Sequence, residues 1–370
     1  MIQALKNLTN RIPVQYENKH CYDILLEDSF QNLPKEMRQF QIENKKLCIV
    51  TETNVGPLYA EELAKILEPL CKKVVIHTFE AGEQHKNLKT VEGIYQTLIE
   101  NKFDRNDMLV ALGGGVVGDT TGFVAATYLR GIDFIQVPTT LLSQVDSSIG
   151  GKTGVDLNAY KNMVGAFYMP KLVYMNINTL MSLPKREYLS GMGEIIKHGL
   201  IKDQEYFHWL NEHYEKIVSR DFDTLKEMLF VSCNIKRQVV ENDPKEKGER
   251  ALLNFGHTIG HAVEKLKNFT LLHGECVALG MCAAAYLTWK ASNIKEDEYQ
   301  LIIDTIQKFE LPTTTIQVDA KEVVEATLND KKMDSGSIKF ILLDSIGEAF
   351  ITKELTQEHL LEATKTIIEE

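Results

Sequence analysis

Alternation of short apolar runs with amphipathic stretches constrains the first half of this chain most strongly. Runs rich in β-branched residues, such as KKLCIVT (residues 45–51) and DMLVALGGG (107–115), alternate with helix-patterned stretches such as NLKTVEGIYQTLIENK (87–102). Strand, helix and strand at this spacing indicate a parallel sheet that helices cover on both faces. The pattern therefore predicts an α/β domain.

The second half of the chain has a different pattern. After SLPKREY (182–188), where Pro184 interrupts the sequence, long amphipathic stretches such as DTLKEMLFVSCNIKRQVVE (223–241) replace the β signal. A chain of 370 residues also exceeds a comfortable single core. We expect two domains, an α/β domain over 1–186 and a mainly α-helical domain over 187–370, with a short β element over 337–351.

Composition narrows the class of protein. The net charge of −11 argues against a nucleic-acid partner, but it leaves a small anionic substrate open because local groups determine a binding site. No apolar run approaches the ~18 residues of a membrane span, and the N-terminal stretch has no signal-peptide pattern. Six cysteines are scattered without a CxxC pair, as reduced thiols would be. We therefore expect a cytoplasmic protein that does not contact a membrane.

A glycine-rich turn follows one of the expected strands. GGGVVG (113–118) comes directly after DMLVAL and leads into the helical stretch DTTGFVAATYLRG (119–131). Glycines let the backbone approach a pyrophosphate, and a helix N-terminus offers it unpaired N–H groups. A tight turn for packing is the alternative, because this is not the first strand–helix turn. The polar loop that follows carries Lys152 and Lys161 and is suited to holding an anion.

Three histidines and a glutamate lie in otherwise apolar, helix-patterned sequence. They are Glu194 in GMGEIIKHG, His257 and His261 in LLNFGHTIGHAVE, and His273 in LLHGE. Burying such groups is unfavourable unless each finds a partner, and imidazoles with one carboxylate suit Zn²⁺ with a position left open. Spacing nominates His257 and His261 as a ligand pair, since residues i and i+4 share a helix face. Hydrogen-bonded or surface histidines are the alternative.

Several long motifs follow one another in a recognisable order. The run from GGGVVG to FYMP (113–170), SGMGEIIKHGLI (190–201), LLNFGHTIGHAVE (252–264) and HGECVALGM (273–281) resemble the 3-dehydroquinate synthase family, over about residues 45–345. The resemblance implies a dehydroquinate synthase-like fold, in which a Rossmann-like NAD-binding α/β domain precedes a mainly helical domain that binds metal and substrate, with the active site between them. It also implies a homodimer, a small anionic sugar-phosphate substrate, and NAD⁺ with Zn²⁺ or Co²⁺ as cofactors.

The resemblance assigns site residues motif by motif. It implies Glu194, His257 and His273 as metal ligands and turns His261 toward the substrate, so it corrects the pair that spacing nominates. The NAD⁺ contacts it implies are Glu52, Asn54, Glu83, Lys86, Gly114, Gly115, Val116, Asp119, Thr139, Thr140, Lys152, Lys161, Thr179 and Ser182. The substrate and catalytic residues it implies are Asp146, Lys152, Asn162, Lys197, Lys236, Arg250, Asn254, His261, one of Lys331 and Lys332, and Arg130, which would enter the site of the partner subunit.

The reaction that the resemblance implies converts 3-deoxy-D-arabino-heptulosonate 7-phosphate to 3-dehydroquinate and phosphate, with NAD⁺ regenerated in each turnover. Related cyclases of sedoheptulose 7-phosphate or glucose 6-phosphate, metal-dependent polyol dehydrogenases and a non-enzymatic binding protein are the alternatives. Arg250 with Asn254 favours a substrate that carries a carboxylate, since arginine offers that anion a bidentate fork. Two positions depart from the family: Glu52 stands where Asp is frequent, and Gly193 where Ala is more usual, with slight expected consequence.

Overall fold

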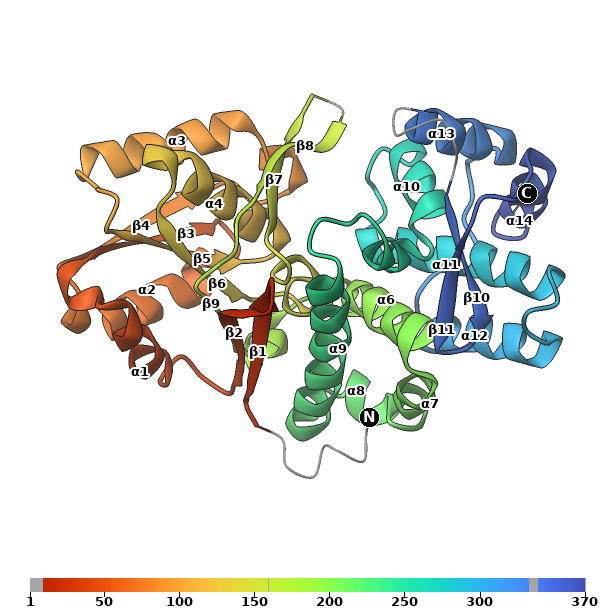
Figure 1. Cartoon of the computed structure of the whole chain (residues 1–370), viewed down its shortest axis with the longest axis horizontal. Helices are drawn as coiled ribbons and strands as arrows, with labels where there is room; N and C mark the ends of the chain where they lie inside the picture. The colour runs from red at the N-terminus through yellow and green to blue at the C-terminus, as the bar shows by residue number, and fades with distance from the viewer. Residues whose placement is uncertain (1–8, 159, 333–338, 370) are drawn as a thin grey trace. The chain divides into compact units, whose positions relative to one another are not determined.

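A computed structural model describes residues 9–158, 160–332 and 339–369 (Figure 1). The chain divides into two compact units between Leu183 and Pro184. Residues 9–183 form a sheet unit, and residues 184–332 with 339–369 form a helical unit. We expected the division after residue 186. Pro184 is the N-cap residue of the first helix of the helical unit, so the helical pattern resumes directly after the interruption.

The sheet unit is built on seven strands in the order β1-β2-β9-β6-β5-β3-β4. From β2 to β4 every neighbouring pair is parallel, as the sequence pattern predicts. Strand β1 pairs antiparallel with β2 at one edge, a hairpin that the pattern did not indicate. The strands are β1 (Arg11–Tyr16), β2 (Lys19–Glu27), β3 (Lys46–Glu52), β4 (Lys73–Phe79), β5 (Met108–Gly113), β6 (Asp133–Pro138) and β9 (Leu172–Asn176).

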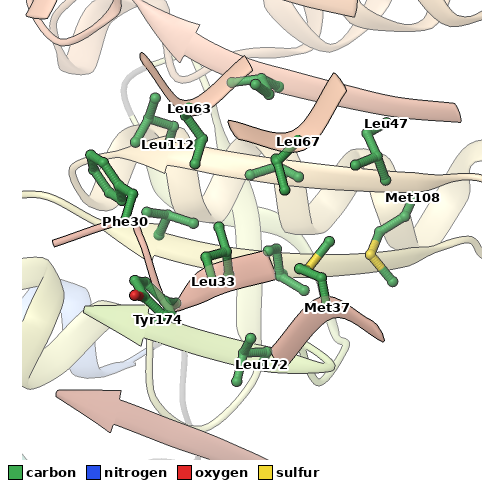
Figure 2. Close-up of a cluster of buried hydrophobic side chains, with 14 of the residues drawn as sticks. Phe30, Leu33, Met37, Leu47, Leu63, Leu67, Met108, Leu112, Leu172 and Tyr174 are labelled. Carbon is green, nitrogen blue, oxygen red and sulfur yellow. The ribbon is translucent and has the colours of Figure 1, made fainter. Parts of the chain in front are cut away.

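Helices cover both faces of this sheet. In β3, Leu47 belongs to the apolar cluster on one face and Cys48 to the cluster on the other, because successive side chains of a strand point to opposite sides. Figure 2 shows the first cluster, where Leu63 and Leu67 of α2 lie over strand residues such as Leu112. The helices of the sheet unit are α1 (Leu33–Met37), α2 (Gly56–Leu67), α3 (Leu88–Glu100), α4 (Gly115–Thr127) and α5 (Thr179–Ser182).

A second, two-stranded antiparallel sheet occupies the stretch that we expected to be a polar loop. It consists of β7 (Lys152–Leu157) and β8 (Tyr160–Phe167). A Cβ atom on Gly154 would lie 2.8 Å from the carbonyl oxygen of Val164, so glycine allows the two backbones to approach closely. The interpretation as a loop was wrong because apolar residues of β8 such as Met163 and Phe167 are exposed beside polar ones, so the strand lacks the apolar period of a half-buried strand.

The helical unit confirms the change of pattern in the second half. It contains the expected β element as the hairpin of β10 (Phe340–Ser345) and β11 (Glu348–Thr352). Among the described residues, no helix is both long and apolar enough to cross a bilayer. The helices are α6 (Lys185–Lys202), α7 (Gln204–Glu212), α8 (Tyr214–Val218), α9 (Phe222–Asn242), α10 (His257–Leu266), α11 (His273–Lys290), α12 (Glu296–Lys308), α13 (Ala320–Lys332) and α14 (Gln357–Lys365).

Glycines let α10 and α11 approach until their backbones touch. A Cβ atom on Gly260 would lie 2.6 Å from the carbonyl oxygen of Cys276, and one on Gly280 would lie 1.7 Å from that of Gly256. Real Cβ atoms do not come this close to backbone atoms, so at the observed separation these positions accept only glycine. The crossing determines how far apart the side chains of the two helices lie.

Candidate metal centre and cofactor-binding residues

Three of the four polar residues that the sequence singles out come together in the helical unit. His257 is the first residue of α10, His273 is the first residue of α11, and Glu194 lies within α6. The two imidazole ring centroids are 5.3 Å apart, and the Nε2 atom of each ring lies 3.5 Å from Oε1 of Glu194. One carboxylate oxygen therefore faces two ring nitrogens, and one ligand atom from each residue lies within 4.8 Å of the others.

The two oxygens of Glu194 have different surroundings. Oε2 accepts a hydrogen bond from Nζ of Lys197, whereas Oε1 is buried without a well-formed hydrogen bond from any described donor. Burial raises the pKa of Glu194, but the adjacent Lys197 together with His273 and His257 holds this pKa well below its usual range. The carboxylate is therefore ionised, and its open oxygen is an unfavourable buried group unless a cation binds it.

The imidazole of His257 is also in the protonation state that binds a cation. Burial, reinforced by the nearby positive charge of Lys197, lowers the pKa of His257 well below its ordinary value. A neutral ring keeps a nitrogen lone pair for a metal ion. An ionised carboxylate beside a neutral imidazole is the protonation state that a Zn²⁺ site requires.

His261 lies beside this cluster but not within it. It is exposed on α10, with its ring centroid 5.1 Å from that of His257. Ligand atoms of His261, Glu264 and His273 also lie within 4.8 Å of one another. Sequence reasoning missed Glu264, which is buried; its position three residues after His261 on the same helix face is the signal that could have found it.

Buried cations and an amide lie at the end of α9 and in the turn after it. Lys236 and Arg250 are both buried, and Nη1 of Arg250 donates to the carbonyl oxygen of Pro244 at 2.9 Å. The side-chain amide of Asn254 donates to Oε1 of Glu246 at 3.0 Å. Buried cationic groups and an amide donor gathered in one region are the kinds of group that bind an anionic ligand.

Asp243 organises the loop that carries Arg250, a role that sequence reasoning missed. Its Oδ1 accepts from the backbone N–H of Lys247 at 2.8 Å, and its Oδ2 accepts from those of Gly248 at 2.6 Å and Arg250 at 3.1 Å. Partial burial raises the pKa of Asp243. The three hydrogen bonds lower this pKa by more than burial raises it, so the net shift is downward. An Asp followed by a Lys- and Gly-containing turn is the sequence signal for such a cap.

The glycine-rich turn lies where the sequence predicts it. Helix α4 begins at Gly115 directly after β5, and its N-cap residue Gly114 supplies no side-chain hydrogen bond to the first turn. A Cβ atom on Gly114 would lie 3.1 Å from Cγ2 of Thr140, and one on Gly115 would lie 3.1 Å from Oγ of Ser147. The free N–H groups of this turn lie at the carboxyl ends of parallel strands, where dinucleotides bind in such folds. Val116 and Asp119 belong to the same helix.

Polar residues assigned to NAD⁺ surround the other strand ends of the sheet unit. Glu52 ends β3, and its carboxylate accepts from the backbone N–H of Asn54 at 2.6 Å and of Val55 at 3.0 Å. Thr139, just after β6, has a buried Oγ1 with no hydrogen-bond partner among the described residues. Thr179 and Ser182 lie together in α5.

Lys86 links the elements that carry further assigned residues. Its Nζ donates to Oδ2 of Asp119 at 2.7 Å and to Oδ1 of Asn162 at 2.6 Å. Burial alone would lower the pKa of Lys86, but the carboxylate of Asp119 raises it above the ordinary value. Lys161 lies 3.6 Å from the carboxylate of Glu83 beside this group. The structure thus brings these five residues together.

The remaining assigned residues lie in other elements. Asp146 is in the π-helical turn η7 (Ser143–Ser147), and Lys152 is an exposed residue at the start of β7. Lys331 and Lys332 end α13, and their side chains fall outside the described residues.

Comparison with known proteins decides the family. Residues 76–190 match the model of the 3-dehydroquinate synthase N-terminal domain, and residues 191–333 match that of its C-terminal domain. The chain belongs to the 3-dehydroquinate synthase family. Members of this family are lyases that form 3-dehydroquinate, so the resemblance drawn from the motifs is confirmed and this chain is an enzyme of that class.

Individual relatives agree with the family match. A 3-dehydroquinate synthase of Ruminiclostridium cellulolyticum is 46% identical over 332 residues, which cover 90% of this chain and 92% of the relative. One of Acetivibrio thermocellus is 44% identical and covers 87% of this chain and 89% of the relative. The solved structure of ValA, a 2-epi-5-epi-valiolone synthase from Streptomyces hygroscopicus subsp. jinggangensis 5008 with NAD⁺ and Zn²⁺ bound, has a TM-score of 0.87 at 26% identity, covering 96% of this chain and 99% of that one.

Proposed function

We propose that this chain converts 3-deoxy-D-arabino-heptulosonate 7-phosphate to 3-dehydroquinate and phosphate, with a bound divalent metal and with NAD⁺ regenerated in each turnover. The observation that carries the proposal is the open, ionised oxygen of Glu194, which faces the ring nitrogens of His257 and His273. Family membership supports the choice of this substrate over those of related cyclases.

Glu194, His257 and His273 would hold the metal, which is Zn²⁺ or Co²⁺ in our proposal. Two imidazoles and a carboxylate are the donors of catalytic zinc sites, and the Zn²⁺ in the related ValA structure supports the same choice. A metal bound here supplies Lewis acidity to a substrate hydroxyl group. Lys197 engages the second oxygen of Glu194, which keeps that carboxylate ionised and leaves Oε1 for the metal. His261, exposed beside the ligands, is positioned to meet the substrate.

The glycine turn at Gly114 and Gly115 would receive the pyrophosphate of NAD⁺. The open first turn of α4 fits a polar ligand, and so does the buried hydroxyl of Thr139, which has no hydrogen-bond partner in the described part of the chain. NAD⁺ supplies reversible hydride acceptance, so that the substrate is oxidised only transiently. The carboxylate of Glu52 is offered to ribose hydroxyl groups, and Asp119 holds Lys86 in its charged form.

The substrate has two anionic ends, and the chain has cations for each. We assign its carboxylate to Lys236 and to Arg250, because the guanidinium fork matches a planar carboxylate. We assign its phosphate to Lys152, Asn162 and one of the two lysines that end α13. Asn254 and Asp146 are assigned to the hydroxyl groups of the substrate.

The proposed enzyme acts as a homodimer in the cytoplasm. Arg130 is exposed, and both it and Leu129 have left-handed backbone angles, with φ of 69° and 50°. Such angles are uncommon for non-glycine residues and are often found at functional positions, which supports offering Arg130 to the site of the partner subunit. All six cysteines are free thiols, which supports a reducing compartment.

A phosphate-release assay tests the proposed reaction. Purified protein would receive the heptulosonate phosphate, Zn²⁺ and NAD⁺ at a small fraction of the substrate concentration. We expect phosphate in many-fold excess over NAD⁺ with no net NADH. Phosphate released only from sedoheptulose 7-phosphate or glucose 6-phosphate would contradict the proposed substrate, and NADH accumulating with a simple polyol would contradict the reaction class.

A further inference from the structure

One face of α6 meets the first residues of α11 over three successive turns. Residues four and eight positions apart lie on one helix face, so α6 presents a row of three side chains. This row runs antiparallel to the start of α11. Each of its three side chains contacts a different one of three successive residues of α11. The three contacts are Arg186 with Glu275, Ser190 with Gly274, and Glu194 with His273.

The outer contact is a fork between a guanidinium and a carboxylate. Nε of Arg186 lies 2.7 Å from Oε1 of Glu275, and Nη2 lies 2.7 Å from Oε2. Nη2 also donates to the carbonyl oxygen of Thr270 at 3.0 Å. Oε2 of Glu275 in turn accepts from the backbone N–H of Leu272 at 2.8 Å, just before the helix. The same carboxylate therefore caps α11 and fixes it to α6.

The middle contact determines the separation of the two helices. The backbone N–H of Gly274 donates to Oγ of Ser190 at 3.1 Å. A Cβ atom on Gly274 would lie 1.7 Å from the carbonyl oxygen of Ser190, and one on Gly193 would lie 2.7 Å from the carbonyl oxygen of Gly274. The backbones touch at this point, so a shift of the first turn of α11 moves His273 relative to Glu194.

We propose that Arg186 and Glu275 are positioning residues for the metal ligand His273. They hold the first turn of α11 against α6, so that Nε2 of His273 stays beside Oε1 of Glu194 in the metal-free protein. This inference rests on the proposed function, because it takes Glu194, His257 and His273 as the metal site. The first turn of a helix frays readily, since its N–H groups have no partners within the helix. His273 is the first residue of α11, and the fork removes that freedom.

The chain offers a matched control for the fork. Lys185 is adjacent to Arg186, is similarly exposed (62% against 57% of the side chain) and pairs with Glu310 at 2.7 Å. Lys185 and Arg186 both line the same surface cavity, whose volume is about 300 Å³. The Lys185 pair joins α6 to Glu310, which follows α12, and not to α11. Both cations are more than half exposed, so neither Arg186→Ala nor Lys185→Ala should unfold the metal-free protein, although Glu275 is only 13% exposed against 49% for Glu310.

Metal affinity separates the two variants. The dissociation constant for Co²⁺ or Zn²⁺ of the metal-free full-length protein would be measured in competition with a chromophoric chelator. We expect binding about tenfold weaker in Arg186→Ala, since groups that orient ligands typically change metal affinity by about 10–100-fold. Lys185→Ala should match the wild type, and Arg186→Lys should fall between, because lysine keeps the charge but not the fork. The visible spectrum of bound Co²⁺ should change only in the Arg186 variants.

Each outcome decides the inference. An Arg186→Ala protein that binds metal within twofold of the wild type would overturn it. A wild-type protein that binds no metal would instead overturn the proposed metal site, and the inference with it. If Arg186→Ala unfolds, Glu275→Gln provides the second test, because glutamine keeps an acceptor for Leu272 while it breaks the ionic fork. The double variant Arg186→Lys/Glu275→Gln should lose no more affinity than Glu275→Gln alone, and additive losses would contradict action through one contact.

Discussion

Glu194 is placed so that only one of its oxygens is open. Lys197 lies three residues further along α6 and engages Oε2, which leaves Oε1 toward the two imidazoles. A positive charge on one side of the carboxylate keeps it ionised despite complete burial. The ammonium of Lys197 therefore prepares a negative ligand in an environment that would otherwise favour the neutral acid.

Glu194→Gln should abolish metal binding, because an amide of the same shape carries no negative charge. We expect the metal dissociation constant to rise by more than about hundredfold, since groups that only orient ligands already change it by about 10–100-fold. Glu187→Gln, the same substitution at an exposed position of α6, is the control and should leave metal content unchanged. Normal metal content in Glu194→Gln by atomic emission would refute the ligand assignment.

The carboxylate of Asp243 gives the Arg250 loop a dependence on pH. Its pKa is lowered in the folded protein from the ordinary 3.8, so its stabilising effect is fully present above that value and is lost as the pH falls through the lowered pKa. The Asp243→Asn variant should be less stable than the wild type at pH 7, and the stability difference between the two proteins should be the same at pH 5. The difference should narrow below about pH 3.8, as urea unfolding would show. A difference that is constant down to pH 3 would contradict the role of the charge.

The crossing of α10 and α11 depends on glycine backbones more than on side-chain packing. Gly260 touches the carbonyl of Cys276, and Gly280 touches that of Gly256, in the same helix pair whose first residues are His257 and His273. A change within the crossing is therefore expected to move the candidate metal ligands His257 and His273 relative to one another.

Gly260→Ala should separate the two helices and weaken both the fold and the metal site. Overpacking of this kind typically costs about 1–3 kcal/mol. Gly93→Ala is the control, because that Cβ atom would meet only a side-chain atom of His77 at 3.9 Å. There the loss of glycine flexibility should leave stability unchanged or raise it by up to about 1 kcal/mol. Thermal unfolding of both variants and the metal affinity of each folded variant test this prediction. If Gly260→Ala and Gly93→Ala change stability and metal affinity equally, the close crossing is not rigid.

The central strands could be predicted from the sequence, and the exposed hairpins could not. Strands such as β5 are buried on both faces and therefore appear as continuous apolar runs. Strand β8 has exposed residues such as Met163 and Phe167 beside polar ones, so it has no regular period. The edge hairpin of β1 and β2 lies in a stretch whose residue pattern did not predict strands.

The metal site shows the limit of spacing within one helix. Residues i and i+4 pointed to His257 and His261, but the residue that completes the candidate cluster with Glu194 and His257 is His273, at the start of another helix. Only tertiary packing brings His273 to His257, so the set could be named from the family resemblance and not from periodicity. Glu264 and Asp243 were missed although local signals existed for both, namely the helix face that Glu264 shares with His261 and the Lys- and Gly-containing turn after Asp243.

Two units with separate cores should respond separately to ligands. A ligand at 100 times its dissociation constant stabilises the unit that binds it by about 2.7 kcal/mol. Zn²⁺ should therefore raise the unfolding transition of the helical unit, which holds Glu194, His257 and His273, and NAD⁺ should raise that of the sheet unit. Urea unfolding followed by hydrogen exchange in each unit measures this, with chelator as the control. Equal shifts of both units by either ligand would show that they unfold as one.

The three candidate ligands are far apart in the sequence, and this has a consequence for the unfolded chain. A metal that joins Glu194 to His257 and His273 closes a long loop, which includes all of α7, α8 and α9. A cross-link that spans a long loop removes much of the freedom of the unfolded chain. The ion that we assign to catalysis would thus also act as a removable cross-link, and its chelation would free the unfolded chain between Glu194 and His273 and so lower the stability of the helical unit.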